Sequence, residues 1–204
     1  MGQEFDGTVT VGGQKVNCRG DFGSDRVRLS GGKRGDVPYK QVEVISTAKG
    51  ILKLRIDGTN VEFPVGPNVD RLANKIRSPA SRLDKMGLQA GTSMAVVGPQ
   101  DRSFLDELKK AGVTYKDGRP SKPVDVLVVS IKETAELEQV GALRDLITPN
   151  GGLWVVYRKG KQDPSEMDVL DAGRGAGLKD IKVARFSETH TALKFVIPLA
   201  ERPA

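Results

Sequence analysis

The chain has 204 residues, of which 38% are hydrophobic, 28% charged and 5% aromatic, and its formal net charge is +6. This length predicts one large domain or two small ones, and the hydrophobic share is sufficient for a core. No apolar run approaches the ~18 residues of a membrane-spanning helix, and no early stretch reads as a signal peptide, so we expect a cytoplasmic protein. The single cysteine, Cys18, excludes an internal disulfide and a cysteine-rich metal site.

Residues 4–65 alternate apolar and polar side chains with a period of two, which is typical of strands with one buried face. Gly12-Gly13 predicts a hairpin turn, because glycine tolerates the positive φ angles of such turns. The segment 30–36 (SGGKRGD) has the composition of a mobile loop. The six short strands that remain predict an antiparallel sandwich or open barrel.

A helix is expected directly after these strands. Asn68 is a suitable N-cap, residues 69–76 carry an apolar stripe, and Ser78-Pro79 ends the helix. The segments DVPYKQVEVI, ILKLRIDGTNVEFPVG and NVDRLANKI resemble a pleckstrin-homology-like domain over about residues 3–77. We therefore expect residues 1–77 to form an all-β antiparallel barrel closed by its C-terminal helix.

Helical and strand patterns alternate in the rest of the chain. We expect helices at 78–87, 101–112, 133–147 and from 163 onward, with Ser78, Asp101 or Ser103, and Asp163 near their starts. Strands are expected near 88–98, 113–115, 124–131, 153–158, 181–186 and 192–197. This alternation predicts a right-handed, mainly parallel sheet. The last two strands form an antiparallel hairpin in this prediction, because the link 187–191 is too short for a parallel crossover.

The expected strand order resembles a shortened methyltransferase-like Rossmann sheet. The segments LDKMGLQAG, VDVLVV, NGGLWVVYRKG and GLKDIKVARFSETHTALKFV are similar to a small bacterial family of uncharacterised Rossmann-like domains, over about residues 81–197. The resemblance implies a Rossmann-like α/β domain at 78–197, followed by a tail at 198–204. It implies a fold and no established activity.

A cofactor in such a sheet lies beyond the carboxyl ends of the parallel strands. The first loop there, residues 98–101, contains Gly98 as its one glycine, and Pro99 removes a backbone donor. An S-adenosylmethionine or nucleotide fingerprint needs several glycines and a preceding carboxylate, where this chain has Val96 and Val97. Asp117 at the end of the next strand is a candidate for binding a ribose. The loop therefore favours an inherited turn without a cofactor.

An anion site is the second candidate at the same edge, because cations that converge beside a helix start suit phosphate. The ligand-binding candidates are Gly98, Asp101, Ser130, Lys132, Arg158, Lys159 and Lys161. The alternative is a solvated charge run at the strand ends.

The excess of basic residues lies almost entirely within residues 1–87. Its members form a candidate basic patch: Arg26, Arg28, Lys33, Arg34, Arg71, Lys75 and Arg77. Such a patch can bind anionic lipid headgroups or nucleic acid. Because few aromatic side chains accompany it, a solvated outer strand face is the preferred interpretation, with nucleic acid and membrane as the less favoured partners.

No catalytic or metal-binding set emerges from the remaining residues. His190 is the only histidine and is expected in the final turn, Cys18 and Trp154 read as core residues, and no serine or cysteine has a nucleophile context. The sequence therefore predicts a non-catalytic binding or scaffolding protein without a cofactor, whose partner is a protein or a small anionic ligand. The alternatives are a divergent S-adenosylmethionine-dependent methyltransferase-like enzyme, a nucleotide- or phosphate-binding protein, and a lipid- or nucleic-acid-binding protein.

Overall fold

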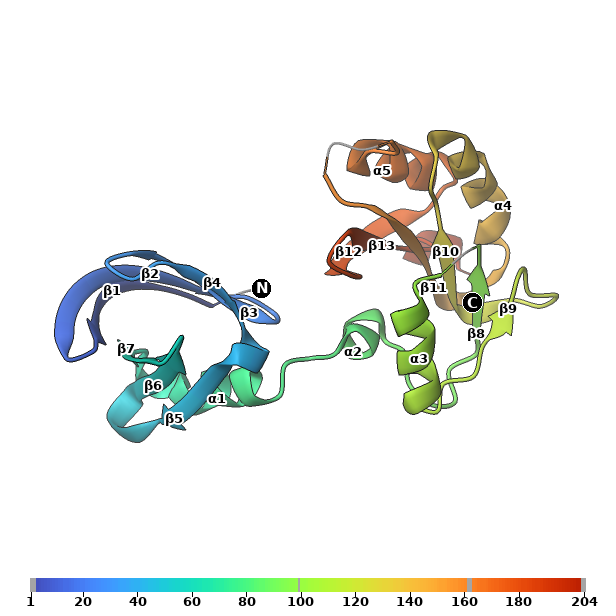
Figure 1. Ribbon diagram of the computed structural model, residues 1–204. Coiled ribbons are helices and arrows are strands. Elements are labelled where there is room, and N and C mark those ends of the chain that lie inside the picture. Colours follow the sequence, from blue (N-terminus) through green and yellow to red (C-terminus); the bar gives the residue numbers. More distant parts are fainter. Residues whose placement is uncertain (1–2, 99, 161–162, 203–204) are drawn as a thin grey trace. The chain divides into compact units, whose positions relative to one another are not determined.

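The computed structural model describes residues 3–98, 100–160 and 163–202. The chain divides into two compact units, the first ending at Ala80 and the second beginning at Ser81 (Figure 1). Each unit has its own hydrophobic core. No helix in the described ranges is both long enough and apolar enough to cross a membrane.

The first unit is built on one antiparallel sheet, sheet A. Its strands are β1 (Gln3–Val11), β2 (Gln14–Phe22), β3 (Arg26–Gly31), β4 (Gly35–Pro38), β5 (Val42–Ser46), β6 (Ile51–Ile56) and β7 (Thr59–Pro64). They lie in the order β4-β3-β2-β1-β7-β6-β5. The turn between β1 and β2 uses Gly12 and Gly13 at φ values of 55° and 92°, as the sequence predicts.

The expected fold of six strands, an antiparallel sandwich or an open barrel closed by the C-terminal helix, is wrong. Sheet A has seven strands and is nearly closed, but β4 and β5 remain at its two edges with no pairing between them in the described residues. The extra strand is β4, which pairs Asp36 with Arg28 and Gly35 with Leu29. Residues 30–36 are polar and rich in glycine, so their composition predicts a loop. The strand forms here through backbone pairing, which composition does not reveal.

Helix α1 (Val69–Arg77) buries its apolar face in the core of the first unit. Leu72 and Ile76 lie in the same cluster as Phe22 and Phe63, whose rings make an edge contact with centroids 5.3 Å apart. The predicted helix is therefore confirmed. Asn68 is at the N-cap position, as predicted, but its side chain makes no capping hydrogen bond.

The second unit is built on sheet B. In the chain, α2 precedes and α3 follows β8, the first strand of this sheet. The elements are α2 (Arg82–Met86), β8 (Met94–Val97), α3 (Arg102–Lys110), β9 (Lys116–Asp117), β10 (Val124–Ser130), α4 (Val140–Arg144), β11 (Ile147–Arg158), α5 (Glu166–Gly175), β12 (Lys179–Arg185) and β13 (His190–Val196). The strand order is β12-β13-β11-β10-β8-β9.

Sheet B is mixed, which corrects the expectation of a mainly parallel sheet. The pairs β8–β9, β8–β10 and β10–β11 are parallel, whereas β11–β13 and β12–β13 are antiparallel. The predicted antiparallel pairing of the last two strands is confirmed. Because β13 inserts between β11 and β12, the reversed strand lies inside the sheet and not at its edge.

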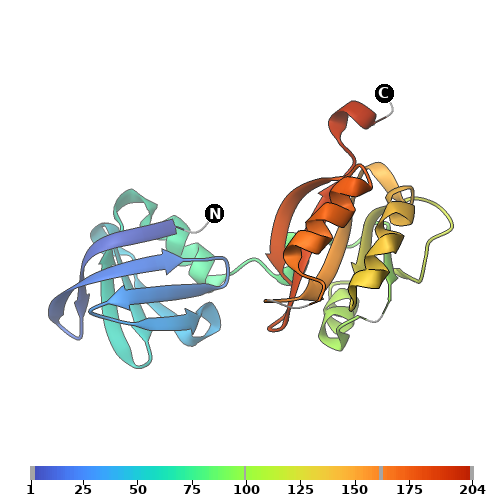
Figure 2. The same ribbon diagram turned by 90° about the horizontal axis from the view of Figure 1, so that it is seen from above.

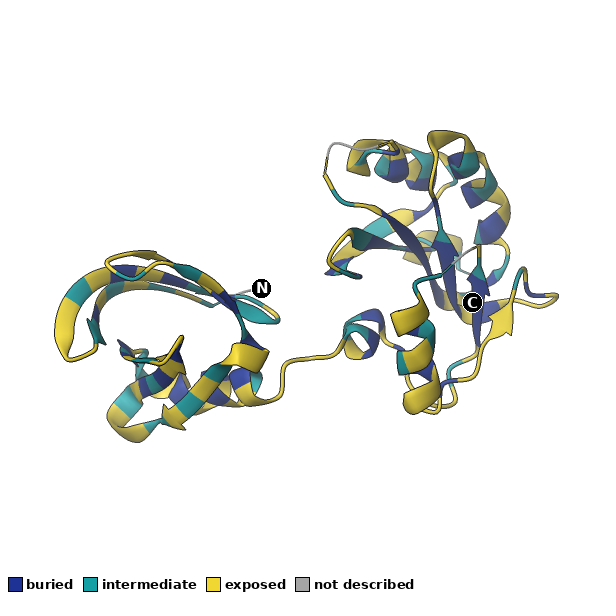
Figure 3. Cartoon of the chain, in the orientation of Figure 1, coloured by how far each residue is buried: buried dark blue, intermediate teal, exposed yellow. Residues whose placement is uncertain are grey.

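Helices cover both faces of sheet B. Leu83 of α2 and Phe104 of α3 pack on one face, and Leu143 of α4 and Val169 of α5 pack on the other. Figure 2 shows α4 and α5 side by side over their face, and Figure 3 shows the central strands almost wholly buried. Trp154 of β11 is fully buried, as predicted for a core residue.

Two helices begin later than the sequence suggests. Helix α2 is capped by Ser81 and α5 by Ser165, each in a reciprocal capping box with an aspartate three residues on. These boxes replace the expected starts at Ser78 and Asp163, because the reciprocal pair satisfies two backbone N–H groups at once. The expected helix over 133–147 is instead a 3-10 helix at Thr134–Gln139 followed by the short α4.

Residues 198–202, where we expect a tail, contact the second unit. Arg202 donates to the carbonyl of Ile197 and to Oδ1 of Asn150, both at 3.0 Å. Glu201 forms an ion pair with Arg144 of α4. Polar side-chain contacts therefore hold this segment against the rest of the second unit. The hydropathy of the sequence does not indicate such contacts.

Candidate functional site

The carboxyl ends of the parallel strands of sheet B lie along one side of the sheet, here called its carboxyl edge. This edge contains a topological switch point between β8 and β10. From β8 the chain continues through α3 to β9 on one side, and from β10 it continues through α4 to β11 on the other. The two helices lie on opposite faces of the sheet (Figure 1). Open α/β sheets bind their ligands in the crevice at such a point.

Gly98 and Ser130, both predicted ligand-binding residues, lie together at this switch point. Gly98 directly follows β8 with φ +78°, and a Cβ at this position would lie 3.2 Å from the Ser130 carbonyl oxygen. Any other residue here would be strained both by its φ and by this approach. The glycine therefore brings the loop after β8 close to the end of β10.

Gln100 occupies part of the same loop, a role that the sequence did not indicate. Its Nε2 donates to the carbonyls of Val97 and Gly98 at 3.1 and 3.4 Å. Its Oε1 is buried and has no hydrogen-bond partner in the described residues. An unsatisfied buried acceptor is costly, so this oxygen suits a donor on a ligand.

Asp101 is the N-cap of α3, one of its two predicted starts. Its carboxylate accepts hydrogen bonds from Ser103 Oγ and from the Phe104 amide. The Ser103 hydrogen bond, above all, lowers the pKa of the Asp101 carboxyl, helped by the Phe104 amide and by the charge of Arg82, while partial burial opposes them. Asp101 is thus an ionised structural cap whose Oδ1 already accepts two hydrogen bonds.

Arg82 of α2 fastens α3 to the end of β12, and the sequence gave no sign of this contact. Its guanidinium donates to Glu107 Oε2, Ser103 Oγ and the Phe186 carbonyl at 3.0, 3.0 and 2.8 Å. It also lies against the rings of Phe104 and Phe186, 5.1 and 4.8 Å from their centroids. The helix start beside the crevice is therefore held rigidly.

The predicted cations of this edge differ in their roles. Lys159 donates from Nζ to the carbonyls of Ser187 and Glu188 at 2.6 and 3.3 Å, so it holds the turn before β13. Arg158 ends β11 and Lys132 follows β10, and both side chains are exposed. Lys161 lies outside the described residues.

His190 begins β13 opposite Arg158, and it lies in the final turn region as predicted. Partial burial, followed by the charges of Arg158 and Lys159, lowers the pKa of the imidazole, although Asp101 opposes the shift. Its Nδ1 lies 2.9 Å from Thr189 Oγ1 and 3.4 Å from Ser187 Oγ. These contacts belong to the turn and do not form a nucleophile–base–acid series.

Asp117 is the last residue of β9 and pairs with Val96 of β8. Val96 lies two residues before Gly98 in the chain. Its side chain is exposed, and the next residue, Gly118, donates its N–H to the Val96 carbonyl at 2.8 Å. The end of β9 is therefore anchored to β8 next to the crevice. A carboxylate at this place suits the hydroxyls of a ribose.

The described residues at this edge offer hydrogen-bonding groups for a ligand. Gly98 and Gln100 lie in the loop after β8, and Asp117 lies at the end of β9. A complete S-adenosylmethionine fingerprint has a carboxylate where this chain has Val97, and the Asp101 Oδ1 already accepts two hydrogen bonds. Among residues 3–98, 100–160 and 163–202, no group of three potential metal ligands lies together.

The basic residues of the first unit are partly neutralised. Arg26 pairs with Asp25 and Asp36 at 3.5 and 3.2 Å, and Arg28 lies 3.4 Å from Asp21. Lys75 donates to the Phe22 carbonyl at 2.6 Å. The exposed members are Arg28 on β3, Arg34 in the β3–β4 turn, and Arg71 and Arg77 on α1, while Lys33 in that turn is half-buried.

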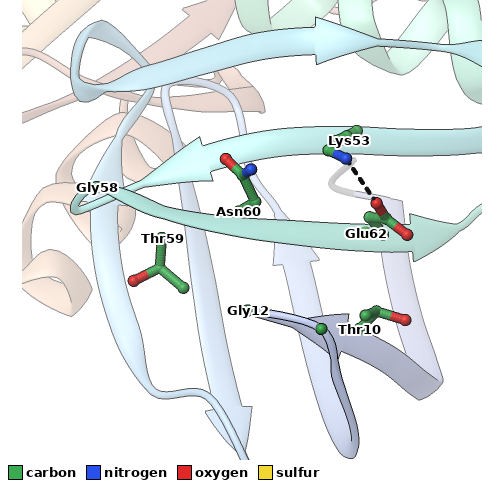
Figure 4. A pocket seen from close by; sticks show the side chains of 8 residues that line it. Thr10, Gly12, Lys53, Gly58, Thr59, Asn60 and Glu62 are labelled. Atoms are coloured by element: carbon green, nitrogen blue, oxygen red, sulfur yellow. Dashed lines mark ion pairs between the residues drawn. The ribbon is translucent and has the colours of Figure 1, made fainter.

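A separate pocket of about 520 Å³ lies between the β1–β2 and β6–β7 turns of the first unit (Figure 4). Lys53 and Glu62 line it and pair with each other at 2.9 Å. Thr10, Thr59 and Asn60 complete a small polar wall. Because its two charges neutralise each other, this pocket has no net attraction for an ion.

No family model matches the chain, and no curated protein matches it. Solved structures similar to it include S-adenosylmethionine-dependent methyltransferases. One from Aquifex aeolicus is 13% identical, with 57% of this chain and 87% of that chain covered and a TM-score of 0.43. The magnesium protoporphyrin IX methyltransferase of Synechocystis, solved with bound SAH, is 11% identical, with 53% and 75% covered and a TM-score of 0.42.

A TehB-like methyltransferase from Corynebacterium glutamicum is 12% identical, with 57% of this chain and 86% of that chain covered and a TM-score of 0.39. Because all three TM-scores are below 0.5, these superpositions carry no argument about activity. In sheet B, β13 runs antiparallel between β11 and β12.

Proposed function

We propose that the second unit is a divergent methyltransferase-like domain that binds an adenosyl nucleoside, of the S-adenosylmethionine class, at its carboxyl edge. The observation that carries the proposal is the close approach of Gly98 to Ser130 at the point where the chain leaves β8 and β10 in opposite directions. Ligands of open α/β sheets bind in this crevice. The proposal takes the alternative that the sequence left open in preference to pure scaffolding.

Two side chains support an adenosyl ligand over a simple anion. Asp117 places a carboxylate at the end of the strand beside β8, where it can accept from ribose hydroxyls. The buried Oε1 of Gln100 lacks a donor, which an amino or hydroxyl group of the ligand would supply. A phosphate offers mainly acceptor oxygens, whereas a nucleoside supplies several hydroxyl and amino donors.

Binding is the proposed role, and turnover is not part of it. When bound, S-adenosylmethionine supplies an activated methyl group. The chain's own contribution at this edge is to orient the nucleoside through Gly98, Gln100 and Asp117, and to fix the loop through Asp101 and Arg82. His190 is engaged by Thr189 and Ser187 of its own turn, so we assign it no proton transfer.

Calorimetric titration of the whole chain with S-adenosylhomocysteine tests the proposal. We expect saturable one-site binding that Asp117→Asn weakens about tenfold or more, because a hydrogen bond to a charged group contributes about 1.5–3 kcal/mol. Asp171→Asn, an exposed position on α5, is the matched control and should bind like the unmodified chain. Equal affinity in both variants would reject the assigned role of Asp117.

For the first unit we propose a pleckstrin-homology-like fold. The support is the strand order β4-β3-β2-β1-β7-β6-β5 followed by the buried face of α1. The ion pairs of Arg26 and Arg28 with Asp21, Asp25 and Asp36 weaken the case for an anionic membrane or nucleic acid as its partner.

A further inference from the structure

A pocket of the second unit lies at the amino ends of the strands of sheet B, opposite the switch point described above. It has a volume of about 440 Å³ and lies between the loop 87–92, the start of β10 and the start of β11. The side chains that matter for its chemistry are Lys194 of β13, Asn150, Asp125 and Thr92. Lys194 is the only lysine or arginine among the residues that line it.

Lys194 is a half-buried cation without a counter-charge. Its ammonium makes no hydrogen bond or ion pair with any residue in the parts of the chain that the structure describes. It lies over Trp154, whose ring centroid is 5.7 Å from Nζ. Burial, and then the nearby charge of Lys182, lowers the pKa of this amine. A partly desolvated ammonium in a polar pocket gains most from an anion beside it.

The surroundings hold Lys194 in one place. Lys194 and Trp154 are directly opposite each other on β13 and β11, and the indole is fixed by its Nε1, which donates to the Met86 carbonyl at 3.1 Å. At Gly152 a Cβ would lie 2.4 Å from Lys194 Cε. Because Gly152 has no side chain, the lysine side chain has room to cross β11 into the pocket.

The other polar groups of the pocket are arranged mainly as donors or are already engaged. Asn150 accepts from Arg202 through Oδ1, so its amide nitrogen remains available to donate. Thr92 Oγ1 accepts from the Gln89 amide, which leaves its hydroxyl hydrogen available. Asp125, the one acid that lines the pocket, accepts from Thr148 Oγ1 at 3.1 Å and forms no ion pair with Lys194.

We propose that this amino-edge pocket binds a small oxyanion, the phosphate or carboxylate group of a metabolite-sized ligand, with Lys194 as its counter-charge. Lys194 supplies the charge, while Asn150 and Thr92 supply neutral donors. The site is separate from the adenosyl crevice, because the two lie at opposite edges of the same sheet. Its test is therefore independent of the function proposed above.

Trp154 provides a direct readout, because it is the only tryptophan in the chain and lies against Lys194. The whole chain is titrated with sodium phosphate, and separately with sodium succinate, against sodium chloride at matched ionic strength, while the indole emission is recorded. We expect a saturable change with at least one of the two oxyanions and only a weak, non-saturating drift with chloride. The arm that saturates identifies phosphate or carboxylate as the recognised group.

Lys194→Met keeps the side-chain stem that packs on Gly152 and removes the charge. We expect this variant to fold and to bind the oxyanion at least tenfold more weakly. Lys116→Met, an exposed lysine on β9, is the matched control and should respond like the unmodified chain. The absence of saturation with both oxyanions, or an unchanged response in Lys194→Met, would overturn the proposal.

Discussion

Replacing Gly173 with alanine should destabilise the second unit, although alanine is the better helix former. Gly173 lies in α5 and faces β13, where a Cβ would be 2.1 Å from Cε1 and 2.5 Å from Cζ of Phe195. Phe195 is fully buried, so its ring has no free space to enter. The glycine is therefore the point at which α5 rests on the sheet.

The magnitude follows from two opposing effects. Forcing a methyl group into a packed core costs about 1–3 kcal/mol, and a contact this short belongs at the upper end of that range. Alanine recovers about 1 kcal/mol of helix propensity. The expected net loss is about 2 kcal/mol in the free energy of unfolding of the second unit.

Denaturant unfolding followed by the fluorescence of Trp154 measures this loss, because the only tryptophan lies in the second unit. Gly175→Ala, on the same helix and with open space at its Cβ, is the control and should stabilise the unit by about 0.5 kcal/mol. Phe195→Leu combined with Gly173→Ala should show less than the sum of the two single losses. If Gly173→Ala stabilises the unit as Gly175→Ala does, the packing argument for α5 is refuted.

Two further predictions concern the side chains that frame the crevice. Arg82→Lys should lower the free energy of unfolding of the second unit by about 2 kcal/mol, because a lysine cannot reach Glu107, Ser103 and the Phe186 carbonyl together. Glu107→Gln should lower it by less, since that side chain is 45% exposed. Equal losses in denaturant unfolding would contradict the role of the guanidinium. His190 has a pKa below 6.5 in the folded chain, so the stability it contributes is present above pH 6.5 and is lost as the pH falls through the folded value. Between pH 7.5 and 5, the thermal unfolding temperature Tm should therefore fall less steeply in His190→Gln than in the unmodified chain. Parallel curves of Tm against pH for the two proteins would exclude burial of a neutral imidazole.

Local sequence patterns predicted the elements better than the way they join. The α1 stripe, the Gly12-Gly13 turn and the final hairpin are local features, and all three are confirmed. The missed strand β4 (GDVP) has one buried apolar residue, Val37, so it is too short to show an alternating pattern, and it forms by pairing with the backbone of β3. Whether sheet A closes into a barrel depends on its two edge strands, and no local pattern encodes their distance.

The candidate site shows the same division between local and distant information. The loop 98–101 was located from its glycine and its place after a buried strand, and Asp101 was identified as one of two possible caps. The contact of Arg82 with Phe186 joins residues 104 positions apart, and the contact of Trp154 with Met86 joins residues 68 apart. Such pairs have no signature in a single sequence, and the same holds for the lysine that crosses Gly152.

Mapping the amide resonances of the whole chain during titration with S-adenosylhomocysteine tests the central claim most directly. An adenosyl ligand at the switch point should shift the amides of Gly98, Asp117 and Ser130, whereas those of Gly151 and Gly152 at the opposite edge should remain in place. Shifts confined to the amino edge, or no shifts at saturating ligand, would contradict a binding site at the crevice between β8 and β10.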